Sequence, residues 1–277
     1  MINNRQVTQV VSGQSTSDGG GVKLKRIIGQ GALPRLDPFL MLDEFGSDQP
    51  DDYLAGFPEH PHRGFQTVTY MLAGKMQHTD SRGNVGMIQS GGLQWMNAGK
   101  GIIHAEMPMQ TQGLMRGFQL WLNLPASQKM SDPSYQDIPQ ADIPVLEVNP
   151  GLQVKVLAGT YGHTSGPVKA QAVKPLFVDI LFHSAQTTTV QLEQGSTAFV
   201  YCYQGSVHIG QSQLERGQLG VLTDGKQLEL AGQADSRCIV VSAQPINEPT
   251  VQYGPFVMNT QQEIEQALQD YRSGKLI

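Results

Sequence analysis

Two short runs of the chain place metal-binding side chains two residues apart. His60 and His62 lie in EHPHRGFQTVTY (59–70), and His104 and Glu106 lie in GKGIIHAEMP (99–108). Side chains at positions i and i+2 of a β-strand project to the same face, so two such strands facing one another would bring three imidazoles and one carboxylate together. Such a group is typical of a site for a divalent transition metal.

Neither pair is strong evidence for a metal by itself, because histidine is also an ordinary surface residue. Pro61 between the first two histidines indicates the start or the edge of a strand. Burying Glu106 without a cation would cost several kcal/mol or force the carboxylate to take up a proton. The joint pattern therefore predicts one metal site with four ligands: His60, His62, His104 and Glu106.

Other polar residues receive weaker assignments. Gln66 lies four residues after His62, so we expect it on the same face, where it could hydrogen-bond to the metal ligands. The alternative interpretation is that Gln66 is simply a polar residue at the mouth of the barrel. We expect structural roles for the histidines that lack ligand-type neighbours, which are His78, His163, His183 and His208.

Composition and charge narrow the class of protein. The 277 residues carry a net charge of −5 and only 19 Lys and Arg, without a basic block, so we expect no direct binding to nucleic acid or to an anionic membrane. No run approaches the roughly 18 apolar residues of a membrane span, and the N-terminus lacks an apolar signal segment. Cys202 and Cys238 read as thiols in a reducing compartment. The expected location is the cytoplasm.

Short strands joined by glycine turns dominate the pattern, which favours an all-β sandwich or barrel. The Pro-rich segment 136–151 interrupts this rhythm and is expected to link an N-terminal metal-binding barrel, 1–135, to a metal-free barrel with a C-terminal helix, 152–277. TVTYMLAGKMQH and AFVYCYQGSVHI echo one another weakly, which indicates a duplicated barrel. Residues 34–58 look irregular. Thr260 and Glu263 form a capping-box pattern that predicts a helix over about 261–273.

The chain resembles the pirin family, a branch of the two-barrel (bicupin) proteins in the cupin superfamily. The resemblance rests on these runs: DPFLMLDEFG (37–46), FPEHPHRGFQTVTYMLAGKMQHTDSRGN (57–84), GGLQWMNAGKGIIHAEMP (91–108) and GFQLWLNLPASQKMSDPSYQD (117–137). It implies two cupin-type jelly-roll barrels in tandem. It also implies an iron-type site in which Gln66 stands at the usual cupin glutamate position and Glu106 supplies the carboxylate. The second half matches only in outline, and the resemblance implies that its barrel lacks metal.

Some bacterial pirin-like proteins cleave flavonols, so the resemblance implies a quercetin 2,3-dioxygenase that uses O₂ and releases carbon monoxide. Fe(II) is the expected ion, although Ni, Co, Cu and Mn also accept these ligands. The substrate would be a small aromatic molecule whose 3-hydroxyl binds the metal and is deprotonated by Glu106. Its apolar pocket would be drawn from nearby aromatic residues: Phe57, Phe65, Trp95 and Phe118.

The alternative is an iron-binding redox sensor that acts through a protein partner, because pirins also include a nuclear cofactor of transcription. The sequence contains no basic or nuclear-targeting run that would favour this alternative. The sequence leaves open the metal, the physiological substrate, the oligomeric state and whether a dioxygenase reaction is the selected function of the metal-binding protein.

Overall fold

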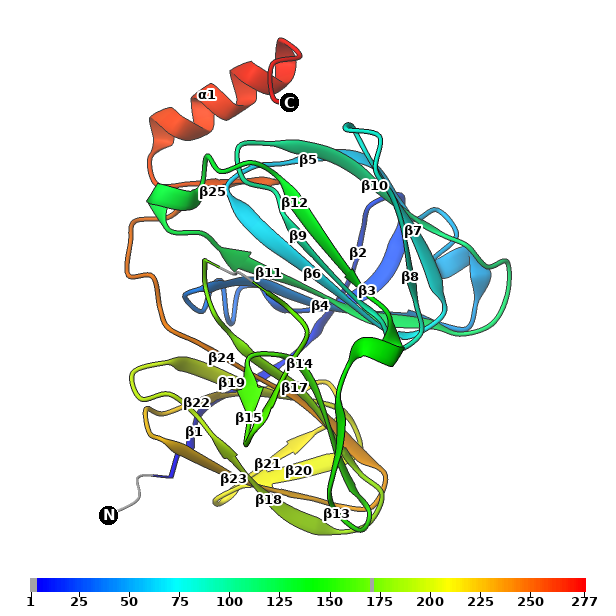
Figure 1. Ribbon diagram of the computed structural model, residues 1–277, viewed down its shortest axis with the longest axis vertical. Coiled ribbons are helices and arrows are strands. Elements are labelled where there is room, and N and C mark those ends of the chain that lie inside the picture. Colours follow the sequence, from blue (N-terminus) through cyan, green and yellow to red (C-terminus); the bar gives the residue numbers. More distant parts are fainter. Residues whose placement is uncertain (1–3, 170–171) are drawn as a thin grey trace. The chain divides into compact units, whose positions relative to one another are not determined.

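Residues 4–169 and 172–277 are described by a computed structural model (Figure 1). Strands make up 57% of the chain and helices 8%, so the all-β expectation is confirmed. The chain forms two compact units, and each contains one seven-stranded and one four-stranded sheet. We call residues 14–30, 39–140 and 246–277 the histidine unit, and the segment ending at Gly13 together with 31–38 and 141–245 the apolar unit.

The histidine unit contains the two ligand-bearing runs. The strands of its large sheet are, in spatial order, β12 (Ser134–Ile138), β9 (Leu93–Asn97), β6 (Phe65–Ala73), β11 (Met115–Asn123), β4 (Phe39–Ser47), β3 (Val22–Ile28) and β2 (Gln14–Asp18). Those of its small sheet are β5 (Phe57–His62), β10 (Ile102–Pro108), β7 (Lys75–Asp80) and β8 (Val85–Gln89). A hairpin of β25 (Val251–Tyr253) and β26 (Phe256–Met258) leads to α1 (Gln261–Arg272). Its short 3₁₀ turns are η1 (Pro50–Asp52) and η2 (Ala126–Gln128), and η3 (Gln140–Asp142) lies where the chain leaves the unit.

The apolar unit repeats the same pair of sheets. Its large sheet has the order β1 (Val7–Ser12), β22 (Gln218–Leu222), β19 (Thr197–Gln204), β24 (Ser236–Ala243), β17 (Leu176–Phe182), β14 (Leu152–Ala158) and β13 (Val145–Asn149). Its small sheet has the order β18 (Gln186–Gln191), β23 (Gln227–Gly232), β20 (Ser206–Ile209) and β21 (Ser212–Glu215), and a further hairpin pairs β15 (Thr160–Tyr161) with β16 (Thr164–Ser165). The repetition agrees with a duplicated barrel.

Two segments that look irregular in the sequence form strands. β4 lies inside the large sheet between β11 and β3, and its first seven residues are all buried. A strand covered on both faces lacks the polar–apolar alternation that reveals a half-buried strand. The expected linker contains β13 and the last residues of β12, which both lie at sheet edges, where proline-rich sequence is tolerated.

The expected division into 1–135, 136–151 and 152–277 follows the chain, whereas the compact units exchange their terminal segments. β1 pairs with β22 in the apolar unit, but β2 and β3 belong to the histidine unit. Residues 246–277 also belong to the histidine unit. Antiparallel sheets join strands that are far apart in sequence, so contiguity along the chain does not determine which sheet a strand enters.

The C-terminal helix forms where the sequence predicts it. The Thr260 side chain accepts a hydrogen bond from the Glu263 backbone, and the Glu263 side chain accepts one from the Thr260 backbone, which completes a capping box. Ile264 and Ala267 are buried with Phe256, Met258 and Leu276. Ile103 of β10 also packs against this cluster, so the helix supports a strand that carries predicted metal ligands.

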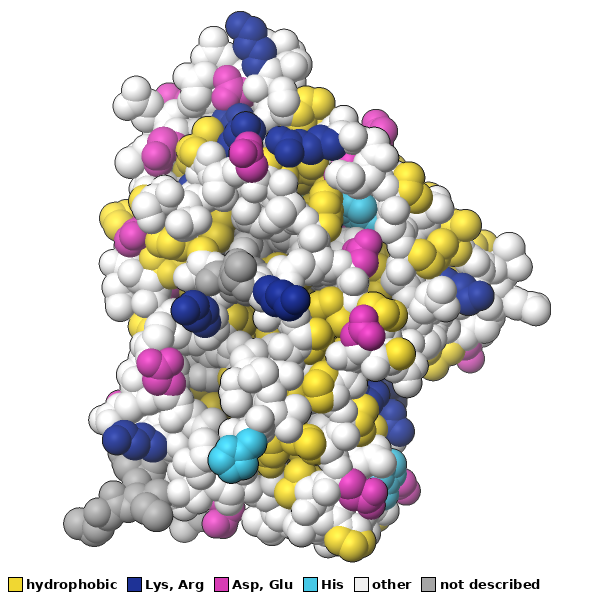
Figure 2. All heavy atoms as spheres, in the orientation of Figure 1, with side chains coloured by type: hydrophobic (Ala, Val, Ile, Leu, Met, Phe, Trp, Pro, Cys, Tyr) yellow, Lys and Arg dark blue, Asp and Glu magenta, His cyan; other side chains and the backbone are white. Residues whose placement is uncertain are grey.

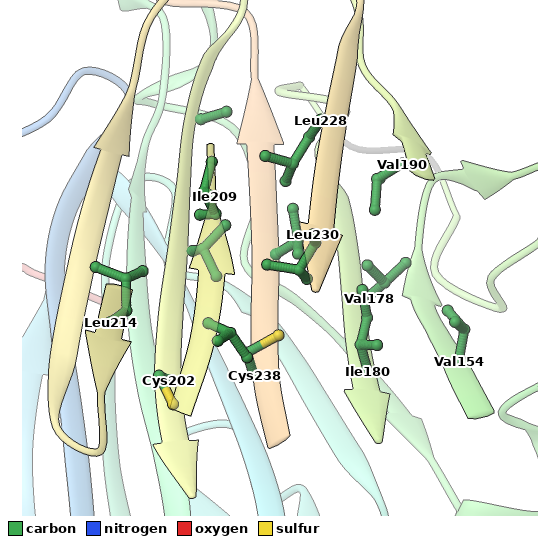
Figure 3. Packing of buried hydrophobic residues seen from close by; sticks show 14 of the residues in the cluster. Val154, Val178, Ile180, Val190, Cys202, Ile209, Leu214, Leu228, Leu230 and Cys238 are labelled. Carbon is green, nitrogen blue, oxygen red and sulfur yellow. The ribbon is translucent and has the colours of Figure 1, made fainter. Parts of the chain in front are cut away.

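Apolar side chains fill the apolar unit between its sheets (Figure 3). Leu228 and Leu230 from the small sheet meet Val178 and Ile180 from the large one, and all four are fully buried. Cys202 and Cys238 are cross-strand partners within this core, and both are thiols. Among the described residues, no histidine, cysteine or carboxylate group in this unit clusters as the three histidines described below do.

Candidate metal centre

Three histidines meet on one face of the small sheet of the histidine unit. β5 and β10 are antiparallel neighbours, and His104 pairs directly with His60. One ring nitrogen from each of His60, His62 and His104 lies within 4.8 Å of the others. The two strands are therefore hydrogen-bonded neighbours in one sheet, rather than two strands that face one another as the sequence suggested.

The unpartnered ring nitrogens of this cluster fit a bound metal. His60 Nδ1 lies 2.8 Å from the Pro58 carbonyl, which can only accept, so Nδ1–H donates and Nε2 keeps its lone pair. His62 Nδ1 and His104 Nε2 are buried and have no hydrogen-bond partner among the described residues. Buried polar atoms are nearly always paired, and a metal ion would provide the missing partner.

Burial keeps these imidazoles in the form that binds metals. Desolvation lowers the pKa of His62 and of His104 well below the usual histidine value, and repulsion from neighbouring imidazoles adds to the effect. His60 is half-buried, while His62 and His104 are 2% and 1% exposed. Metal ligation requires a neutral ring nitrogen, so the site is prepared for a cation without first releasing protons from these two rings.

Glu106 lies beside the histidine cluster but outside the group joined within 4.8 Å. Its side chain is 3% exposed, and its Oε1 accepts a hydrogen bond of 3.0 Å from Thr69 Oγ1 on β6. Among the described residues, Glu106 forms no salt bridge with a lysine, arginine or histidine. A buried carboxylate of this kind needs a nearby cation, and a metal held by the histidines would supply one.

His78 joins this site although the sequence gave it only a structural role. It lies on β7 opposite Glu106, is 1% exposed, and its Nδ1 is 3.2 Å from His104 Nδ1. Burial lowers the pKa of His78, and the nearby Glu106 carboxylate opposes that shift. The i, i+2 pattern missed this residue because its relation to His104 depends on the register between β7 and β10. The sequence alone does not reveal that register.

Phe65 and Trp121 form the aromatic wall of the cluster. Ring centroids lie 5.0 Å apart for His62 and Phe65, and 5.3 Å apart for His62 and Trp121. Phe57 is half-buried and packs against an apolar cluster that includes Met71 and Met76. The sequence reasoning named Phe118 and passed over Trp121, three residues later on β11, because the sequence does not show which face of that strand meets the histidines.

Three of the expected neighbours lie on the other face of the large sheet. The Thr69 side chain points toward Glu106. Successive side chains of a strand point to opposite faces, so Gln66, three residues earlier on β6, points to the other face. The register pairs Val68 with Trp95, and Tyr70 with Phe118, so these two aromatic residues share the face of Gln66. Gly64, with φ +87°, lies in the turn between β5 and β6. The alternation of side chains along β5 does not continue through a turn, so the spacing between His62 and Gln66 does not place them on one face.

Comparison with known proteins places the chain in a family. The family model described as Pirin matches residues 21–122, and the model described as Pirin C-terminal cupin domain matches residues 177–277. The chain belongs to the pirin family. The two-barrel cupin architecture expected from the sequence is thereby confirmed.

Relatives match this pirin along almost its whole length. A Pseudomonas aeruginosa protein with the provisional name quercetin 2,3-dioxygenase is 46% identical, covering 100% of this chain and 99% of the relative. Human pirin is 38% identical and covers 99% of this chain and 95% of its own. The crystal structure of a quercetin 2,3-dioxygenase from Acinetobacter baumannii matches with a TM-score of 0.93 and 32% identity over 99% of both chains.

Charged side chains of both signs share the face of this pirin that Figure 2 shows. On the face in Figure 2, Lys and Arg side chains are interspersed with Asp and Glu rather than gathered in one patch. No helix among residues 4–169 and 172–277 has the length and apolar character needed to cross a bilayer.

Proposed function

We propose that this pirin is a metal-dependent dioxygenase that cleaves a flavonol of the quercetin type with O₂ and releases carbon monoxide. The observation that carries the proposal is the group of three histidines beside the buried carboxylate of Glu106, in which His62 and His104 each have an orphaned, buried ring nitrogen. The names of the Pseudomonas relative and of the Acinetobacter structure support the choice of reaction.

His60, His62 and His104 would hold the ion, and Glu106 would complete or border the site. Fe(II) is the ion we expect, with Ni, Co, Cu and Mn as alternatives. When bound, the metal supplies Lewis acidity toward the flavonol 3-hydroxyl and redox chemistry toward O₂. Three neutral imidazoles and one carboxylate leave the site with a charge of about +1, which favours an anionic substrate.

The protein's own residues would accept the proton of the substrate and provide an apolar surface for its ring. Glu106 accepts the proton of the 3-hydroxyl, which leaves an electron-rich flavonolate for reaction with O₂. Both oxygen atoms enter the ring-opened ester, and one ring carbon leaves as carbon monoxide. Thr69 orients the accepting carboxylate through its hydrogen bond to Oε1. Trp121, which is half-buried and packs against the fully buried Phe65, offers apolar surface against which a flat ring can lie.

The direct test measures carbon monoxide. Purified protein is loaded with Fe(II) without oxygen, mixed with quercetin and opened to air, while carbon monoxide and flavonol absorbance are followed. We expect one carbon monoxide per flavonol consumed, and none in His62→Ala. Glu106→Gln should lose turnover far more than it loses metal. Bound metal without carbon monoxide for Fe, Ni, Co, Cu and Mn would overturn the proposal and favour the redox-sensing alternative.

A further inference from the structure

His78 touches the metal site from the strand on the other side of β10. The register of β7 and β10 sets His78 opposite Glu106 and Asp80 opposite His104. The rings of His78 and His104 have centroids 4.9 Å apart, and their Nδ1 atoms are 3.2 Å apart. The Tyr135 ring covers His78 with a centroid distance of 4.7 Å, so His78 is held from a third strand as well.

Two neutral imidazoles that meet through Nδ1 share one hydrogen atom, and its position decides what His104 can do. If His104 Nδ1–H donates, His104 Nε2 carries a lone pair and can bind a metal. If His78 Nδ1–H donates, His104 Nε2 carries the hydrogen and cannot. Both His104 Nε2 and His78 Nε2 are buried without a partner among the described residues, but only His104 belongs to the group of three histidines, so His104 Nε2 is the atom left for the metal.

We propose that His78 is a positioning residue that accepts the Nδ1–H of His104 and holds the Nε2 lone pair of His104 toward the metal. The inference rests on the metal centre of the proposed function. A metal-binding histidine usually donates its other ring N–H to a carboxylate, a backbone carbonyl or water. A neutral imidazole in that place orients His104 without adding a second negative charge beside Glu106.

The tautomers can be read directly in the intact protein. The full chain, labelled with ¹⁵N-histidine and loaded with Zn(II), is examined by long-range ¹H–¹⁵N correlation. We expect His104 to show a protonated Nδ1 and a metal-shifted Nε2, and His78 to show a protonated Nε2. A protonated His78 Nδ1 facing a deprotonated His104 Nδ1 would overturn the proposal.

Paired variants separate hydrogen bonding from packing. His78→Asn keeps a hydrogen-bond acceptor near the position of Nδ1, whereas His78→Leu keeps volume and removes the acceptor. Affinity for Co(II) is measured by competition with a chelator, and the Co(II) absorption spectrum reports ligand geometry. We expect His78→Leu to lose about 10–100-fold in affinity with an altered spectrum, and His78→Asn to recover most of both.

Met76→Leu serves as the matched control, because Met76 is buried on the same strand but packs in an apolar cluster. Wild-type affinity and spectrum in His78→Leu would sink the proposal, as would an equal loss in both His78 variants. These measurements are independent of turnover. Normal Zn(II) and Co(II) binding without carbon monoxide release would remove the proposed reaction and leave the role of His78 standing.

Discussion

Thr69 is the residue through which the large sheet reaches the Glu106 carboxylate. Its hydroxyl lies 3.0 Å from Glu106 Oε1 and 2.6 Å from the side-chain amide of Gln119. The atom of Gln119 placed there is Oε1, to which the hydroxyl donates; with the amide oxygen and nitrogen exchanged, the hydroxyl donates to the carboxylate while it accepts from the amide NH₂. Glu106 is therefore restrained from the opposite side of the barrel.

Replacing Thr69 with valine should impair proton transfer more than metal binding. The change keeps the shape and removes the donated hydrogen bond, and a hydrogen bond to a charged group contributes about 1.5–3 kcal/mol. We expect turnover to fall about ten-fold or more with metal content within two-fold of wild type. Thr67→Val is the control, because Thr67 is buried two residues earlier on the same face of β6. Equal losses in both variants would contradict a specific role for Thr69.

The buried histidines make the metal-free protein sensitive to acid. Their pKa values are lowered in the folded state, so below the unfolded value of about 6.5 the unfolded chain binds more protons than the folded chain. The stability that depends on the neutral imidazoles is present above this pH and decreases with a steady slope as the pH falls below it, with His62 and His104, whose pKa values are lowered furthest, as the main contributors. The free energy of unfolding in urea, measured at pH 7.5, 6.5 and 5.5, should show this slope. Exposed His163→Gln should leave it unchanged, and a flat profile would refute the expectation.

The candidate ligands could be named from the sequence because strand spacing alone predicts that His60 and His62 share one face and that His104 and Glu106 share another. The residues that surround these ligands could not be predicted from the sequence, because their positions depend on strand register and on turns. His78 was read as structural, and Gln66 was expected on the ligand side, for this same reason. Side chains within one strand can be placed from the sequence, whereas partners across strands cannot.

At the scale of elements, Arg63 ties the C-terminal helix to both ligand strands. It follows His62 directly, and its Nη1 lies 2.7 Å from Asp270 Oδ2 on α1. Its Nε donates to the Lys100 carbonyl in the loop before β10. Arg63 is 5% exposed at its side chain and Asp270 is 20% exposed, so water screens the pair only in part.

Asp270→Asn should weaken the metal site from a distance. The variant keeps the shape of the side chain but loses the charge that faces Arg63, at a cost of about 1–3 kcal/mol. We expect a lower melting temperature and a Co(II) affinity reduced about five-fold. Glu265→Gln, an exposed change on the same helix, should alter neither quantity. Unchanged Co(II) affinity in a destabilised Asp270→Asn would limit the helix to a stabilising role.

Element boundaries followed the sequence closely where a local signal marks them. The helix expected over about 261–273 is α1 (Gln261–Arg272), which begins at its capping box. β4 was missed because burial on both faces removed its alternation. β13 was missed because prolines surround an edge strand.

At the scale of the whole molecule, the two units share an architecture but not a chemistry. The histidine unit directs imidazoles into its interior, and the apolar unit fills the equivalent space with aliphatic side chains. The second unit should therefore contribute stability without direct influence on the metal.

Leu230→Ala tests whether the apolar unit contributes stability without influencing the metal site. Leu230 is fully buried in the apolar core, and such a truncation costs about 2–5 kcal/mol. We expect a clear drop in melting temperature with Co(II) affinity within two-fold of wild type. Val85→Ala, at an exposed position, should leave the melting temperature nearly unchanged. A parallel loss of Co(II) affinity in Leu230→Ala would show that the two units are energetically coupled.

The exchange of terminal segments has a consequence for biosynthesis. All three clustered histidines have been translated once residue 104 is in place, yet residues 246–277, which include Asp270, are the last part of the histidine unit to be made. A ribosome-bound chain that has reached Pro245 therefore carries its ligands but not the helix that secures Arg63 beside them. The order of synthesis favours binding of a metal only after residues 246–277 have been made and have closed these contacts.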